Sequence, residues 1–76
     1  MGFIDAGFGN FVNAARIITV VSPESLPVRR LIQDAKNAGR VIDVSCGKKT
    51  KSVIVTDSDH VICSALEPNE ISALIR

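Results

Sequence analysis

Apolar residues recur every three or four positions between residues 26 and 38, which is the spacing of one helix face. The apolar positions are Val28, Leu31, Ile32, Ala35 and Ala38. Ser25 has the side chain of an N-cap, Pro27 is tolerated in the first turn, and Gly39 permits a left-handed stop. The pattern therefore predicts an amphipathic helix over residues 26–38.

Five shorter apolar runs lack helical spacing, and their many β-branched residues favour strands. The runs are residues 3–6, 16–21, 41–44, 52–56 and 60–65. The third and fourth are expected to pair as a hairpin with a cationic tip, followed by a turn at Asp57-Ser58-Asp59. Pro68 is expected to open a short C-terminal helix.

These elements follow the order ββαβββα. The predicted fold class is α+β, a small mostly antiparallel sheet with one main amphipathic helix and a short C-terminal helix. Residues 1–76 are expected to form a single domain, because neither a linker nor a repeat interrupts them.

The composition adds an expectation of self-association. The chain has 76 residues, 46% of them apolar, and a mean hydropathy of +0.26. A domain of this size buries only about 60% of the surface that its unfolded chain exposes, so a lone core is marginal. Two cysteines and one histidine do not supply a disulfide framework or a zinc cage within one chain. A homo-oligomer would cover the remaining apolar surface and the open sheet edges.

The apolar residues do not predict a membrane span, since every run is far shorter than the roughly 18 residues that a span needs. The N-terminus has no basic start and carries Asp5 where a signal peptide would be hydrophobic. The two cysteines look unpaired, so a reducing, cytoplasmic location is expected.

Charge is distributed unevenly along the chain although the net charge is only +1. Residues 29–51 hold seven basic and two acidic side chains, a local charge of +5, whereas residues 52–76 hold one basic and four acidic side chains, a local charge of −3. A basic segment beside an acidic one suits two roles. It can bind a polyanion, or it can join subunits head to tail.

Three possible reactive sites have simpler explanations. Gly7-Phe8-Gly9 lacks the third glycine of a dinucleotide-binding loop, so a backbone bend or a subunit contact through Phe8 and Phe11 is the better interpretation. Asp57-Ser58-Asp59-His60 does not continue as a calcium loop and is typical of a turn. Cys46 lies among lysines that would favour its thiolate, but no substrate site is evident. We therefore expect no metal, no cofactor and no enzymatic activity.

The strongest functional signal is the segment from Gly47 to Lys51, because three ammonium groups and a hydroxyl suit contact with phosphates. Its polar members are Lys48, Lys49, Thr50 and Lys51. The alternative explanation is a solvated basic face. Base stacking is disfavoured, since the chain has no tyrosine or tryptophan and its three phenylalanines all lie in the first eleven residues.

Several motifs resemble the RemA-like family of extracellular matrix regulatory proteins. They are Gly7-Phe8-Gly9-Asn10, Arg16-Ile17-Ile18, Ser22-Pro23-Glu24-Ser25 with Pro27 and Arg30, Ile32-Gln33-Asp34-Ala35, and Asp57-Ser58-Asp59-His60. The likeness spans nearly the whole chain. It implies a LytTR-like fold and a ring-shaped homo-oligomer that binds double-stranded DNA and regulates transcription of biofilm matrix genes.

The resemblance also implies roles for individual residues. The family's Arg-Arg-Thr-Arg loop corresponds to Lys48-Lys49-Thr50-Lys51, and its functional arginine corresponds to Arg16. Lysine is a point charge suited to phosphate, whereas arginine can also fork onto bases, so the departure supports DNA binding more than sequence preference. Pro27 is expected to set subunit geometry, and Arg29 and Arg30 to face either DNA or a neighbouring subunit.

Two other functions remain open at this point. An oligomeric scaffold would use the cationic loop to bind a protein or a small anionic ligand. An enzyme would use Cys46.

Overall fold

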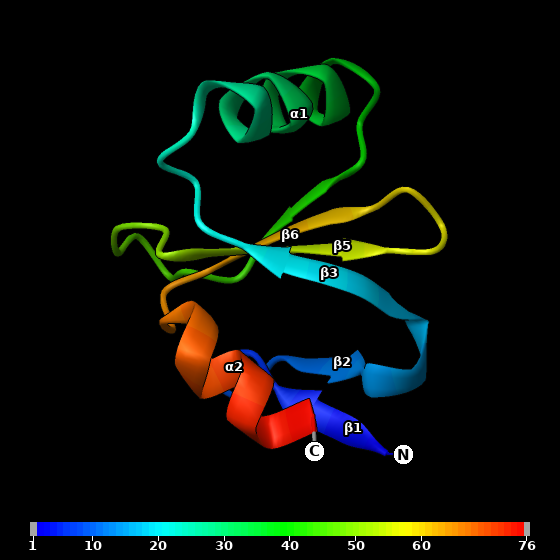
Figure 1. Ribbon diagram of the computed structural model, residues 1–76, viewed down its shortest axis with the longest axis vertical. Coiled ribbons are helices and arrows are strands. Elements are labelled where there is room, and N and C mark those ends of the chain that lie inside the picture. Colours follow the sequence, from blue (N-terminus) through cyan, green and yellow to red (C-terminus); the bar gives the residue numbers. More distant parts are fainter. Residues whose placement is uncertain (1, 76) are drawn as a thin grey trace.

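The structure is a computed structural model that describes residues 2–75. Three layers are visible in Figure 1: helix α1 (Leu26–Asn37) covers one face of a four-stranded sheet, and a two-stranded hairpin together with helix α2 (Pro68–Ile75) covers the other. The predicted α+β class is confirmed, and most strand pairs are antiparallel.

The four-stranded sheet has the order β3-β5-β6-β4. Its strands are β3 (Ile17–Val21), β4 (Val41–Asp43), β5 (Ser52–Thr56) and β6 (Val61–Ser64), and the separate hairpin pairs β1 (Phe3–Asp5) with β2 (Phe11–Asn13). The two central strands are buried on both faces. Ile54 and Ile62 pack toward the hairpin and α2, while Val53 and Val61 pack beneath α1.

The predicted hairpin between residues 41–44 and 52–56 is wrong. β4 pairs in parallel with β6, and β6 lies between β4 and β5. The physical reason is that β5 and β6 are joined by a much tighter turn, and the fully buried β6 gains most from the central position. The connection from β4 to β5 therefore passes around the end of β6.

The predicted turn at residues 57–59 is confirmed. The Asp59 amide donates to the Thr56 carbonyl at 3.1 Å, and Asp59 adopts a φ of 63°. A type I turn followed by a left-handed residue is a common way to close a three-residue hairpin loop.

The N-terminal segment contains more structure than expected. The expected edge strand 3–6 is present as β1, but β2 and a 3-10 turn, η1 (Ala14–Arg16), were not predicted. A three-residue strand with one buried side chain, Val12, gives too short a pattern to recognise. η1 replaces the start of the strand expected at residue 16, so β3 begins at Ile17.

Helix α1 follows the prediction closely. The Ser25 hydroxyl accepts a hydrogen bond from the Val28 amide at 3.4 Å, as an N-cap does. At the other end, the Gly39 amide donates to Lys36 and the Arg40 amide donates to Ala35, with Gly39 at a φ of +72°. This pair of bonds is a Schellman motif, in which glycine adopts the left-handed conformation without a steric penalty.

Several large apolar side chains remain exposed. All three phenylalanines belong to this set, and Phe3, Phe8 and Phe11 are 69%, 56% and 65% exposed. The others are Ile18 on β3, Ile42 on β4, Leu26 and Leu31 on α1, and Leu74 on α2. Both β3 and β4 are outer strands, so apolar side chains lie at both edges of the sheet.

Candidate nucleic-acid interface

The cationic residues 48–51 belong to the connection between β4 and β5, residues 44–51, which we call the lysine loop. Both of its ends are attached to the carboxyl end of β6. The Val44 amide donates to the Cys63 carbonyl at 2.9 Å, and the Lys51 amide donates to the Ser64 carbonyl at 2.8 Å. The loop therefore projects from a buried strand end and is not a free segment.

A side-chain bond strengthens the start of this loop. One carboxylate oxygen of Asp43 accepts from both the amide and the hydroxyl of Ser45, at 2.9 and 2.6 Å. Ser45 is buried, and these bonds to the ionised carboxylate lower the pKa of Asp43. The bonds reverse the chain where it leaves β4, as Asx turns do.

The tip of the lysine loop is a tight turn. The Lys48 amide donates to the Ser45 carbonyl at 3.1 Å, and the two central residues, Cys46 and Gly47, have φ values of 54° and 78°. Positive φ at both central positions defines a type I′ turn. Glycine suits this conformation, but cysteine carries a Cβ and is strained there.

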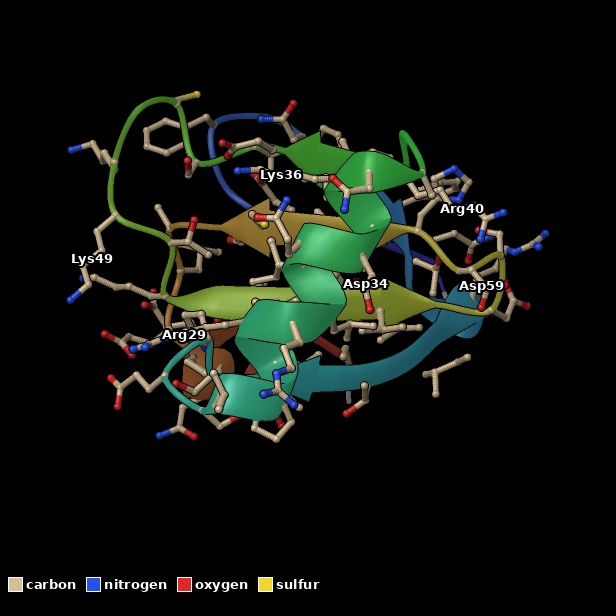
Figure 2. The ribbon with its side chains drawn as sticks, turned by 90° about the horizontal axis from the view of Figure 1, so that it is seen from above. Arg29, Asp34, Lys36, Arg40, Lys49 and Asp59 are labelled. Atoms are coloured by element: carbon tan, nitrogen blue, oxygen red, sulfur yellow. The ribbon has the colours of Figure 1, made fainter. Side chains whose placement is uncertain are left out.

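The lysines differ in how freely they can contact a ligand. Lys48 and Lys49 are exposed, and the described structure gives neither of them an ion pair. Figure 2 shows Lys49 reaching outward at one end of the sheet. Lys51 is also exposed, but its Nζ lies 3.7 Å from a carboxylate oxygen of Glu67, and Thr50 is half-buried. Within the lysine loop, the positive charge that is not ion-paired is therefore concentrated at Lys48 and Lys49.

A groove of about 330 Å³ lies beside the lysine loop. Its walls are residues 22–24, 49–51 and 67–69, so it combines two lysines with two carboxylates, Glu24 and Glu67. Glu67 lies next to α2, and its amide donates to the Glu70 carboxylate at 3.0 Å. The acidic side chains make the groove less suited to anions than the outer side of the loop.

Arg16 lies at the opposite end of the sheet from the lysine loop. Ile17, the next residue, pairs with Thr56 at the far end of β5, and five strand residues span about 17 Å. Figure 1 shows the loop at one end of the sheet and the start of β3 at the other. The two cationic elements expected to act together are thus separated within one chain.

Arg16 also has an acidic partner. Its Nε donates to a carboxylate oxygen of Asp57 at 2.9 Å. Neither this partner nor Glu67 beside Lys51 was recognised from the sequence, because 41 and 16 residues separate the members of the two pairs. For Lys51 and Glu67 the opposite charges of residues 29–51 and 52–76 were the available signal, but they do not reveal which side chains meet, and Arg16 lies outside both segments.

The remaining predicted positions lie in different parts of the fold. Arg29 and Arg30 are exposed on α1, and Figure 2 shows Arg29 toward the same end as Lys49, with Arg40 and Asp59 toward the other. Pro27 lies in the first turn of α1.

Phe8 occupies the tip of the β1–β2 hairpin with a φ of 56°, and Phe11 points outward from β2. Both aromatic side chains are therefore available to a partner.

The candidate reactive groups do not form a site. Cys63 is buried, and that burial raises the pKa of its thiol, whereas Cys46 is exposed at the loop tip. His60 Nδ1 lies 2.8 Å from the Ser58 hydroxyl inside the turn. Among residues 2–75, no three histidine, cysteine or acidic side chains are grouped so as to hold a metal ion. Within the same range, no helix is both long and apolar enough to cross a bilayer.

Comparison with known proteins gives one consistent result. The sequence model of the family described as "RemA-like: Extracellular matrix regulatory protein A-like" matches residues 3–74. A regulatory protein of Geobacillus thermodenitrificans is 53% identical over 72 residues, covering 95% of this chain and 83% of the relative. Regulatory proteins of Synechococcus elongatus and Alkaliphilus metalliredigens are 51% and 52% identical over 72 and 69 residues, with 83% and 74% of their lengths covered.

Proposed function

We propose that this protein, which belongs to the RemA-like family of extracellular matrix regulatory proteins, binds double-stranded DNA as a closed homo-oligomer. Its role is regulatory and not catalytic, in keeping with the names of its relatives. Within this proposal the protein regulates transcription of extracellular matrix genes in the cytoplasm, and its core has the LytTR-like arrangement that the resemblance implies.

The observation that carries the proposal is the lysine loop. Its backbone is held at both ends by β6, yet Lys48 and Lys49 project into solvent without an ion pair among the described residues. A fixed backbone that presents unpaired ammonium groups suits a polyanion, because ordering the loop costs little when the ligand binds. Lysine acts as a point charge, so the loop supports phosphate contact more than base recognition.

One chain alone makes too few contacts for tight binding. Three phosphate contacts correspond to a log–log salt slope of about −2.7, which is small for a DNA-binding protein. A homo-oligomer repeats the loop, and each bound loop raises the effective concentration of the next along the same duplex. The exposed phenylalanines and the two apolar sheet edges support self-association.

The test combines native mass spectrometry with DNA titrations over a range of salt concentrations and duplex lengths. Wild type is compared with a variant in which Lys48, Lys49 and Lys51 are replaced by alanine. We expect an oligomeric wild type whose affinity increases with duplex length, and a variant that assembles normally but loses most of its affinity.

Two results would overturn the proposal. One is a variant that assembles and binds DNA as tightly as wild type, which would show that the lysine loop makes no contribution. The other is a wild-type oligomer that ignores DNA of every length. That result would favour a scaffold whose loop binds a protein or a small anionic ligand.

A further inference from the structure

The ion pair between Arg16 and Asp57 is placed where its contribution to stability is small. Both side chains are exposed, by 59% and 50%. Exposed ion pairs contribute between 0 and about 1 kcal/mol, because solvent screens the charges and two side chains lose rotamer freedom. Stability alone therefore gives a weak reason for this contact, and its geometry suggests another role.

The backbone around Arg16 is fixed by two hydrogen bonds and by a neighbouring bulge. Arg16 is the last residue of η1, where the Ile17 amide donates to the Ala14 carbonyl. The Arg16 carbonyl accepts from the Asp57 amide at 2.9 Å. A register shift in the β3–β5 pairing follows between Ile17 and Thr19. Such bulges redirect neighbouring side chains, so the direction in which Arg16 leaves the backbone is fixed.

The turn that carries Asp57 is held as well. The Thr56 hydroxyl lies 2.9 Å from the Ser58 hydroxyl, which lies 2.8 Å from His60 Nδ1. The Thr56 amide donates to the His60 carbonyl at 3.1 Å. These bonds connect the two sides of the turn and leave Asp57 little freedom relative to β5.

The contact with Asp57 uses only one of the donors of Arg16. A guanidinium has five N–H groups, and the Nε–H points to Asp57 at 2.9 Å. The four N–H groups of the two terminal nitrogens have no protein partner among the described residues. They form the planar fork that binds phosphates or guanine edges in bidentate fashion.

We propose that Asp57 is a positioning residue that orients the Arg16 guanidinium for contact with DNA. The inference rests on the DNA-binding function proposed above. Because Asp57 holds Nε, the side chain is ordered before the ligand arrives, and the terminal nitrogens keep their N–H groups free of partners among the described residues and so available to a ligand. The carboxylate itself repels phosphates, so it improves binding only where the orientation of Arg16 matters. Asp57 therefore acts on discrimination between sequences and not on general affinity for DNA.

The chain offers a matched control in the same turn. Asp57→Ala and Asp59→Asn each remove one negative charge from this turn, but only Asp57 forms an ion pair with an arginine within the described residues. Asp59 has a φ of 63°, which asparagine tolerates, so this control does not strain the turn. Asp57→Ala removes the acceptor completely.

The probes are the duplex that wild type enriches most strongly from a random-sequence pool, and the same duplex with its sequence shuffled. For Asp57→Ala we expect the affinity ratio between the two to fall by about 2- to 12-fold per contacting protomer, the effect of losing one pre-ordered side chain. Affinity for the shuffled duplex should stay the same or rise, because a negative charge is lost. Asp59→Asn should leave the ratio unchanged.

A mutant cycle tests whether Asp57 acts through Arg16. In an Arg16→Ala background, Asp57→Ala should no longer change the ratio. The Nε–H signal of Arg16, observed by NMR in the absence of DNA, should be protected from solvent exchange in wild type and lose that protection in Asp57→Ala. Loss of protection shows that the contact between Arg16 and Asp57 is broken. The mutant cycle shows whether that contact contributes to the discrimination between the two duplexes.

Three outcomes would overturn the positioning role while leaving the proposed function intact. They are an unchanged ratio in Asp57→Ala, an equal fall in Asp59→Asn, and a fall that persists without Arg16. Failure of the proposed function would be seen differently, as a wild type that binds neither duplex.

Discussion

Cys46 offers a sharp test of how the lysine loop is built. Its φ of 54° at the first central position of a type I′ turn places a Cβ in a left-handed conformation that costs about 1–2 kcal/mol. Asparagine tolerates this conformation, and Cys46→Asn would give the Asn-Gly pair that type I′ turns prefer. We expect the free energy of unfolding to rise by about 1 kcal/mol. The melting temperature of a domain this small should then rise by about 4–8 °C.

Two further changes at the same position serve as controls. Cys46→Ala keeps the Cβ and should leave stability near that of wild type. Cys46→Gly relieves the strain but increases the freedom of the unfolded chain, a cost of about 0.5–1 kcal/mol, so its gain should be smaller than that of asparagine. Urea unfolding and calorimetry at one fixed protein concentration measure the differences, since assembly itself stabilises the fold.

The result that refutes this reasoning is a ranking in which Cys46→Asn is no more stable than Cys46→Ala. The same variants also test the enzymatic alternative. If the thiol has no chemical role, all three variants should bind DNA with the salt slope of wild type. A function lost equally in all three would point instead to chemistry at the sulfur.

Three other predictions follow from the described contacts. Lys49→Gln should reduce the log–log salt slope of DNA binding by about 0.9 per contacting protomer, whereas Lys36→Gln, an equal charge change on α1, should leave it unchanged in the same titration. Phe8→Asn removes an exposed aromatic side chain, so sedimentation equilibrium should show weaker self-association. The fold should lose no stability, because asparagine tolerates the left-handed backbone conformation at this position. An unaltered oligomer distribution would contradict the expected subunit contact through Phe8. Bonds from Ser45 lower the pKa of Asp43, so Asp43→Ala should be less stable than wild type at pH 7. Urea unfolding should show this difference closing as the pH falls below the ordinary pKa range of an aspartate carboxyl, where the wild-type carboxylate is finally protonated in the folded state.

The elements predicted correctly are those whose signals are local. The helix that begins after Ser25 and ends before the left-handed Gly39 depends on spacing, a cap and a left-handed stop, which all lie within fifteen residues. The turn at residues 57–59 likewise depends on neighbouring polar side chains. Such signals are strong because backbone preferences and capping bonds act over one or two turns of chain.

The errors concern which segments meet. Residues 41–44 and 52–56 are consecutive strands, and only the tighter turn after Thr56 and the burial of β6 decide that β6 separates them. The position of Arg16 relative to the lysine loop follows from the same pairing, since β3 runs antiparallel to β5 and reaches the loop only at its far end. The basic residues of the candidate site were named from their residue type and stay a prediction, whereas their grouping in space depends on the sheet order.

The position of Arg16 limits how a single duplex can use both cationic elements. About 17 Å of β5 separates Arg16 from the lysine loop, so one chain presents two small cationic patches at opposite ends of its sheet. Each is too weak to bind DNA tightly, because one to three phosphate contacts release few counterions and so supply little affinity. In a closed assembly both sites recur at fixed intervals, and the Arg16 end of one protomer can approach the same stretch of duplex as the lysine loop of another. The affinity of the assembly should therefore depend on both ends together. Arg16→Ala and the triple lysine variant should each reduce the DNA affinity of the oligomer by a larger factor than they reduce the affinity of an isolated protomer. Equal losses of affinity in both states would refute the cooperative use of the two ends.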